Sequence, residues 1–258
     1  MHDPSVKMVD RIVAILRLLG GRDERGAALA EICAETELQK TTAHRILGAL
    51  VDSGLVFQDI LTRNYRLGFA ATALGRSARE QDVASAARVS LIRLAASSGD
   101  TAFASVHEGT AAICVAREVG EFPIRTLTLS VGDRRPLGVG AGSLALLAAL
   151  SDDVIDKTLK RNESWLRDFQ GFSAGHVRKL VERTRKDGFA CNDGGIVPGM
   201  NAVGIAVVDE HGAPLAALSI AAIKDRMTKG RISELVDLLD AEKKSLETMM
   251  RPLRRAAE

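Results

Sequence analysis

The chain has few aromatic residues: they make up 3% of its 258 residues, with a single tryptophan and a single tyrosine. Its hydrophobic content of 46% is still ample for a buried core, so that core must be aliphatic. Cysteine is also scarce, and the three present, Cys33, Cys114 and Cys191, are odd in number and scattered. This pattern argues against a disulfide framework and favours a reducing cytoplasm.

Long hydrophobic runs are absent too. Apolar stretches such as 144–150 are far too short to span a bilayer, and the first residues lack the basic and apolar segments of a signal peptide. The formal net charge is only +2, so any contact with nucleic acid must be local. We therefore expect a soluble cytoplasmic protein of one or two domains, without contact to membranes.

Motifs that would indicate catalysis or metal binding are missing as well. The five histidines have no ligand-like spacing with one another or with the cysteines, so we expect no metal site. No nucleophile elbow or other catalytic signature is present, and we expect neither enzyme activity nor a cofactor. Cys191, beside Asn192, is compatible with a redox sensor, although a buried apolar thiol is the commoner outcome.

The most informative segment of the chain is residues 28–68. It predicts a short helix, a tight turn, a second helix and a small β-hairpin, and a further amphipathic helix precedes it and ends at Gly20-Gly21. The expected strands cover 55–57 and 65–67, after Gly54. The apolar positions expected on the buried sides of the three helices are Val6, Val9, Ile12, Val13, Leu16 and Leu19; Leu29, Ile32 and Cys33; and Ala43, Ile46, Leu47, Leu50 and Val51. This succession is typical of a winged helix-turn-helix, which lays one helix in the DNA major groove.

Polar residues occupy the first turns of the helix that would enter the groove. Their types suit base edges, phosphates and thymine methyls, and two arginines on the predicted wing are placed to reach the adjacent backbone or minor groove. The candidate DNA-binding residues are Gln39, Lys40, Thr41, Thr42, His44, Arg45, Arg63 and Arg66. The alternative is a plain helical bundle with a polar outer face. From Lys40 to Arg66 four basic residues stand against two acidic ones, a modest electrostatic footprint.

Beyond the wing the pattern changes. We expect a linker helix over 69–79, with Gln81-Asp82 as a polar interruption, a helix over 83–97 and a turn at 98–100. The remaining prediction is of strands at 101–106, 111–118, 124–129, 199–208 and 214–222, and of helices at 143–150, 153–160, 174–186 and 232–250. The sequence thus predicts an α+β body with a mostly antiparallel sheet. The domains are a DNA-binding domain over 1–68, a linker helix over 69–82 and a regulatory domain over 83–258.

A glycine-rich loop, Gly138-Val139-Gly140-Ala141-Gly142, precedes one of the predicted helices. Its spacing matches neither the dinucleotide fingerprint nor a P-loop. The backbone N–H groups at the start of the helix are suited to a small anion such as a carboxylate. A tight strand-to-helix turn without a ligand is the plainer alternative.

Five short motifs stand in a specific order along the chain: the run 40–47, Tyr65-Arg66-Leu67-Gly68, the stretch 132–147, Asp187-Gly188-Phe189-Ala190 and Ala217-Leu218-Ser219-Ile220. Through these motifs the chain resembles the IclR (isocitrate lyase regulator) family of bacterial transcriptional regulators over nearly its whole length. One departure is Glu37-Leu38-Gln39, where the family usually has Gly-Leu-Pro. The resemblance implies a GAF-like effector-binding domain, with the glycine loop closing over a small effector.

The resemblance also implies an effector site. Family members that bind small keto-acids have an Asp, a Cys and two Ser at the positions of Asn192, Ala202, Ser219 and Ala221, and the loop contributes at Ala141 and Gly142. This chain keeps only Ser219 of the four. Because a buried carboxylate with fewer donors is costly, we expect a larger, more apolar organic acid or an aromatic catabolite. It would lie on Ile124, Leu127, Leu129 and Met200, unless these residues simply form an apolar core.

Two classes of function follow. The first is a sequence-specific DNA-binding regulator in which an effector shifts the placement of two heads in a dimer. The family adds dimers of dimers, and the linker helix is the expected first interface. The second is an enzyme or ligand-binding module without specific DNA reading. An enzyme would need titratable groups converging near the glycine loop, whereas the side chains of Asn192, Ala202 and Ala221 do not titrate.

Overall fold

The computed structural model describes residues 4–22, 25–76 and 80–255, and the chain falls into two compact units, residues 1–79 and 80–258. The last part of the predicted linker helix, 77–79, lies outside the described residues. The side chains of Gln81 and Asp82, the predicted polar interruption, are likewise not described. Among the described residues no helix is long and apolar enough to cross a membrane.

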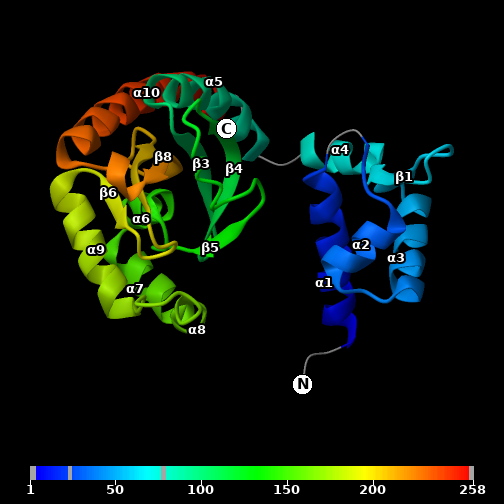
Figure 1. Ribbon diagram of the computed structural model, residues 1–258. Coiled ribbons are helices and arrows are strands. Elements are labelled where there is room, and N and C mark those ends of the chain that lie inside the picture. The colour runs from blue at the N-terminus through cyan, green and yellow to red at the C-terminus, as the bar shows by residue number, and fades with distance from the viewer. Residues whose placement is uncertain (1–3, 23–24, 77–79, 256–258) are drawn as a thin grey trace. The chain divides into compact units, whose positions relative to one another are not determined.

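The first unit is a helix-turn-helix with a hairpin (Figure 1). Its elements are α1 (Pro4–Gly20), α2 (Leu29–Thr36), α3 (Lys40–Asp52), β1 (Val56–Gln58), β2 (Tyr65–Leu67) and α4 (Phe69–Arg76). The two strands pair antiparallel, and Ala27 adds a single bridge to Tyr65. The core comes from α1, α2, α3 and the hairpin, and its largest fully buried side chains are Ile15, Ile32 and Leu47. The winged helix-turn-helix prediction is therefore confirmed.

Three of the predicted buried positions are wrong. Val9 and Val13 on α1 and Val51 on α3 are exposed, whereas Ile15 is fully buried. The buried stripe of α1 runs through Ile12, Ile15 and Leu19, a face rotated from the one that the sequence favoured. Short apolar runs on a 17-residue helix leave this rotation undetermined, because valines on either side of the stripe fit the same periodicity.

The second unit is an α+β body around one sheet. Its helices are α5 (Glu80–Ser98), α6 (Ala141–Ala148), α7 (Asp152–Arg161), α8 (Glu163–Leu166), α9 (Ala174–Asp187), the short 3₁₀ helix η1 (Lys224–Arg226) and α10 (Lys229–Arg255). Its strands are β3 (Thr101–Glu108), β4 (Ala111–Val119), β5 (Arg134–Pro136), β6 (Ala190–Asp193), β7 (Met200–Val208) and β8 (Pro214–Ile223). All pairings are antiparallel, in the order β5-β4-β3-β8-β7-β6, which confirms the predicted fold class.

Helices cover both faces of this sheet (Figure 1). On one face α5 and α10 bury the side chains of alternate strand residues such as Ala104, Leu218 and Ile205. On the other face α6, α7 and α9 pack through Leu146, Ile155 and Val177. A third, smaller apolar cluster sits beside α6 on that second face and comprises Phe103, Cys114 and Ala221, with Leu129 and Ala202 against it.

The predicted strand over 124–129 is wrong, because these residues are irregular. The edge of β4 pairs instead with β5, a three-residue strand that the sequence analysis missed along with β6 and α8. The carbonyls of Thr128 and Leu129 accept hydrogen bonds from the side chains of Arg135 and Arg117 rather than from a neighbouring strand. Side-chain donors thus replace the ladder that the apolar pattern suggested.

Candidate functional sites

The turn between α2 and α3 fixes the position of the helix that would enter the groove. The carboxylate of Glu31 accepts a hydrogen bond of 2.7 Å from the N–H of Ala28 at the start of α2. Helix α2 ends at Thr36, and the next residue, Glu37, adopts a left-handed conformation with φ of 55°. Gln39, in extended conformation, directly precedes α3 and makes no side-chain hydrogen bond to its first turn. Within the described residues the first N–H groups of α3 donate to no acceptor, and exposed N–H groups at a helix start favour a phosphate.

The candidate residues of α3 lie mostly on its outer side. Gln39, Lys40, Thr41, His44 and Arg45 are exposed, and Thr42 is half-buried. The opposite side packs Ala43, Ile46, Leu47 and Leu50 into the core. Three- and four-residue spacing brings the exposed side chains onto one face of the helix. A row of donors on a helix anchored from behind is the arrangement by which major-groove helices reach base edges.

The two wing arginines differ in their surroundings. Arg66 is half-buried, pairs with Asp59 at 3.3 Å and lies over the ring of Phe57. Arg63 has an exposed side chain and a φ of 60° in the hairpin loop. The hydrogen bonds that Thr62 donates through its N–H and hydroxyl hold the pKa of Asp59 below its usual range. The carboxylate thus fixes the loop and restrains Arg66, while Arg63 extends from it.

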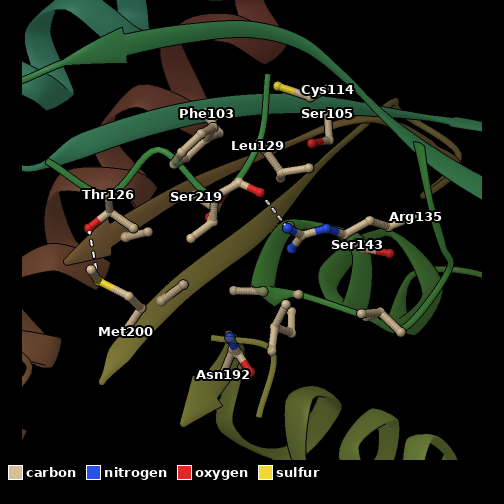
Figure 2. A pocket seen from close by; sticks show the side chains of 18 of the residues that line it. Phe103, Ser105, Cys114, Thr126, Leu129, Arg135, Ser143, Asn192, Met200 and Ser219 are labelled. Carbon is tan, nitrogen blue, oxygen red and sulfur yellow. Dashed lines mark hydrogen bonds between the residues drawn. The ribbon is translucent and has the colours of Figure 1, made fainter. Parts of the chain in front are cut away.

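The second unit contains a pocket between the sheet, the start of α6 and the irregular segment before β5 (Figure 2). It holds about 610 Å³ of space free of protein atoms, part of it open to solvent. Apolar side chains line it, among them Phe103, Leu129 and Met200. Alternate residues of β3, β4 and β8 face it because successive strand residues point to opposite sides of the sheet.

Two glycines bring the start of α6 onto this sheet. A Cβ at Gly204 on β7 would lie 2.9 Å from the carbonyl carbon of Ala141, so the helix end can rest on the strand only if this side chain is absent. Gly140 has a φ of 97°, in the region that favours glycine, and sets the turn into the helix. The hydroxyl of Ser143 accepts from the N–H of Gly138 and donates to the carbonyl of Pro136. Loop and helix are thereby locked together.

Several polar side chains of the pocket have no hydrogen-bond partner among the described residues. Within residues 80–255 the side chains of Ser105, Ser219 and Asn192 make no hydrogen bond. Thr126, by contrast, donates to the sulfur of Met200 at 3.5 Å (Figure 2). Buried polar groups normally have partners, so groups free to bond inside a pocket are suited to a ligand.

Most of the predicted effector residues lie around this pocket. Those that line it are Leu129, Ala141, Gly142, Asn192, Met200, Ala202, Ser219 and Ala221. Two do not: Ile124 and Leu127 are 52% and 53% exposed and are absent from its lining. The segment that contains them turns Thr126 and Thr128 inward and leaves Leu127 exposed.

Sequence reasoning missed other lining residues, above all Arg135. This arginine lies in β5, and its guanidinium extends among the pocket's labelled side chains (Figure 2). Phe103 and Cys114 were also missed, and burial raises the pKa of the Cys114 thiol to about 11. The available signal was the position of Arg134-Arg135-Pro136 directly before the glycine loop, where a cation adjoins a predicted anion-binding turn.

A winged helix-turn-helix with a polar outer helix face, joined to an α+β body with a small pocket, is the architecture of a DNA-binding transcriptional regulator. Family models identify this chain further. The IclR helix-turn-helix domain matches residues 8–59, and the bacterial transcriptional regulator IclR C-terminal domain matches residues 75–247. The chain belongs to the IclR family of DNA-binding transcriptional regulators.

Individual proteins agree with this placement. The chain is 25% identical to the HTH-type transcriptional repressor AllR of Salmonella typhi over 253 residues, which span 95% of this chain and 90% of the relative. It is 24% identical to the transcriptional repressor IclR of Escherichia coli K12, over 90% of this chain and 86% of the relative.

Solved structures share the fold. The crystal structure of the Thermotoga maritima IclR has a TM-score of 0.70 at 19% identity and covers 95% of this chain and 99% of its own. An IclR homologue from Microbacterium hydrocarbonoxydans, crystallised with 4-hydroxybenzoate, has a TM-score of 0.72 at 20% identity with the same coverage. At these identities the likeness extends to the fold alone.

Proposed function

We propose that this regulator binds operator DNA through α3 and the wing, and that an organic acid or aromatic catabolite in the pocket of the second unit alters that binding. The proposal that the protein binds DNA is supported most strongly by the row of exposed side chains on α3. Gln39, Lys40, Thr41, His44 and Arg45 are accessible while the residues between them anchor the helix. Arg45 and Gln39 are suited to base edges, and Lys40, Thr41, Thr42 and His44 to phosphates or bases.

The wing adds contacts at the edge of this surface. Arg63 is the better placed of its two arginines, because its side chain is exposed. Arg66 would contact the backbone only after loosening its pairing with Asp59. Positive side chains of this kind suit the adjacent phosphates or the narrow minor groove.

The protein would act as a homodimer or as a dimer of dimers, because helix-turn-helix regulators read two half-sites with two heads. In this mechanism the effector favours one placement of the heads and thereby changes which half-site spacing fits. Because operator DNA lies in the cytoplasm of a bacterial cell, the protein would act there. An effector with an apolar body is supported by the lining of the pocket, and the homologue with 4-hydroxybenzoate is a precedent for an aromatic acid on this fold.

The test is a selection from randomised DNA duplexes by the purified full-length protein at moderate salt. We expect a shared, roughly two-fold sequence. Arg45→Ala should weaken binding to that sequence by about 5- to 150-fold, the range for loss of a base contact of about 1–3 kcal/mol. Arg167→Ala is the matched control. Arg167 is exposed and directly follows α8, and its substitution removes the same charge from the second unit.

The outcomes are distinct. A shared sequence that Arg167→Ala retains and Arg45→Ala loses supports the proposal. If wild-type protein enriches no sequence, with or without organic acids, α3 is not a reader of DNA sequence. The alternative of a ligand-binding module would then replace the proposal.

A further inference from the structure

Arg135 occupies a defined place at the pocket wall. Strand β5 pairs it with Ala112 of β4, and its half-buried side chain lines the pocket. The guanidinium donates a hydrogen bond of 2.5 Å to the carbonyl of Thr128. It also lies close to the glycine loop, since a Cβ built on Gly140 would be 3.5 Å from Nη1. A cation is thus fixed between the start of α6 and the irregular segment 124–129, called here the covering segment.

This cation has no carboxylate partner within the described residues. Its neighbour Arg134 pairs with Glu108, but Arg135 has no carboxylate within 4 Å in the part of the chain that is described. Removal from water lowers the pKa of the Arg135 guanidinium, and the more distant charge of Asp133 acts in the opposite direction. Partial burial of an unpaired charge is unfavourable, and an anionic ligand would relieve it.

The surroundings of Arg135 suit the two ends of an organic acid. Beside the guanidinium lie the N–H groups of Ala141 and Gly142, the first two residues of α6. As the first N–H groups of a helix they have no acceptor within it, and they lie at its positive end. Away from it lie Phe103, Leu129 and Met200, which offer apolar surface. The pocket is therefore charged at one end and apolar at the other.

We infer that Arg135 binds the carboxylate of the effector and restricts this pocket to organic acids that have an apolar body. The inference rests on the proposed function, in which this pocket holds the effector. Four of Arg135's five N–H donors are left after the bond to Thr128, enough for the paired contacts that guanidinium and carboxylate groups form. A neutral amide of the same shape offers one acceptor oxygen, no charge and two donors facing a cation.

The test is calorimetric titration of the full-length protein, without DNA, with a panel of monocarboxylic acids and their amides. The panel runs from acetate and pyruvate to octanoate, benzoate and 4-hydroxybenzoate, each acid beside its matched primary amide. We expect at least one of the larger acids to bind and its amide to bind at least 10-fold more weakly. Arg135→Gln should weaken binding of that acid by about 10- to 100-fold and leave the amide unchanged.

Arg117→Gln is the matched control. Arg117 donates a hydrogen bond of 2.9 Å to the carbonyl of Leu129, the neighbour of Thr128, but does not line the pocket. If Arg135 only held the covering segment in place, both variants would lose acid binding alike. Circular dichroism of each variant identifies any loss of folding.

The inference is overturned if no acid binds, if amides bind as well as acids, or if Arg135→Gln binds acids like the wild type. The last two of these outcomes leave the proposed function intact, since the protein still binds a ligand. Tightest binding by acetate or pyruvate would likewise contradict the requirement for an apolar body. Failure of DNA reading is detected separately by the duplex selection.

Discussion

Glu37 occupies a backbone conformation that suits glycine. It ends α2 with a φ of 55°, and its exposed side chain makes no hydrogen bond within the described residues. Because the turn that Glu37 forms sets the angle between α2 and α3, the strain lies inside the DNA-binding motif. We predict that Glu37→Gly stabilises the first unit.

The magnitude follows from two opposing terms. A residue with a Cβ in the left-handed region costs about 1–2 kcal/mol relative to the right-handed one, and glycine avoids this cost. Glycine also gives the unfolded chain more conformational freedom, which lowers the free energy of unfolding by about 0.5–1 kcal/mol. The net gain in the free energy of unfolding is therefore about 0.5–1 kcal/mol. For a unit of this size it corresponds to a rise of about 2–8 °C in the midpoint of thermal unfolding.

The chain contains a convenient pair of probes. Its single tyrosine, Tyr65, is buried in the first unit, and its single tryptophan, Trp165, lies in the second. Near-ultraviolet circular dichroism and fluorescence of the full-length protein thus follow each unit separately. Glu37→Gly should raise the midpoint reported by Tyr65 and leave that reported by Trp165 unchanged.

Two control variants separate the causes. Glu37→Gln removes the carboxylate near the negative end of α2 but keeps the Cβ, so it isolates the contribution of charge. Ala34→Gly places glycine at an exposed, ordinary helical position of α2 and should destabilise by about 1 kcal/mol. The reasoning is refuted if Glu37→Gly lowers the midpoint as Ala34→Gly does, because the residue would then not be strained.

The remaining predictions concern other parts of the molecule. Gly48→Ala on α3 should raise the free energy of unfolding of the first unit, measured by denaturant titration, by about 1 kcal/mol, because a methyl there meets nothing within 4 Å; a loss of stability would contradict this. Gly204→Ala should lower stability by about 1–3 kcal/mol, since its Cβ would lie 2.9 Å from the backbone of Ala141, whereas Gly175→Ala, with open space around it, should not. Cys114, with a pKa of about 11, stays a protonated thiol at pH 8.5. Iodoacetamide should therefore label it roughly 100-fold more slowly than an ordinary cysteine, with a rate that rises as pH approaches 11; mass spectrometry showing equal rates would refute its burial.

Local patterns were sufficient to predict the first unit. The apolar spacing of α3 and the residues around Gly54 act within a few turns of chain, so the helix, its buried side and the hairpin follow from the sequence. The orientation of α1 did not follow, because Ile15 and the exposed Val9 and Val13 are equally apolar. Only the packing of the whole unit selects which of them is covered.

The pocket depends on contacts between residues distant in sequence. The glycine loop was recognisable as a helix start that suits an anion, but β5 has three residues and no alternating pattern, which concealed Arg135. The segment 124–129 has the composition of a strand, yet its carbonyls bond to Arg117 and Arg135. Such replacement of a ladder by side-chain donors depends on tertiary structure and has no local signature.

An acid bound in the second unit is expected to change DNA binding by the first. The most direct measurement is the affinity of the full-length protein for its selected duplex, by fluorescence anisotropy at fixed salt, as the acid identified by calorimetry is titrated. We predict a change in affinity of about 5- to 150-fold, in either direction, with a midpoint near the dissociation constant of the acid. Arg135→Gln should shift this midpoint to higher acid concentration. An unchanged affinity at saturating acid would contradict the proposed regulation, because a ligand without differential affinity for two states cannot shift them.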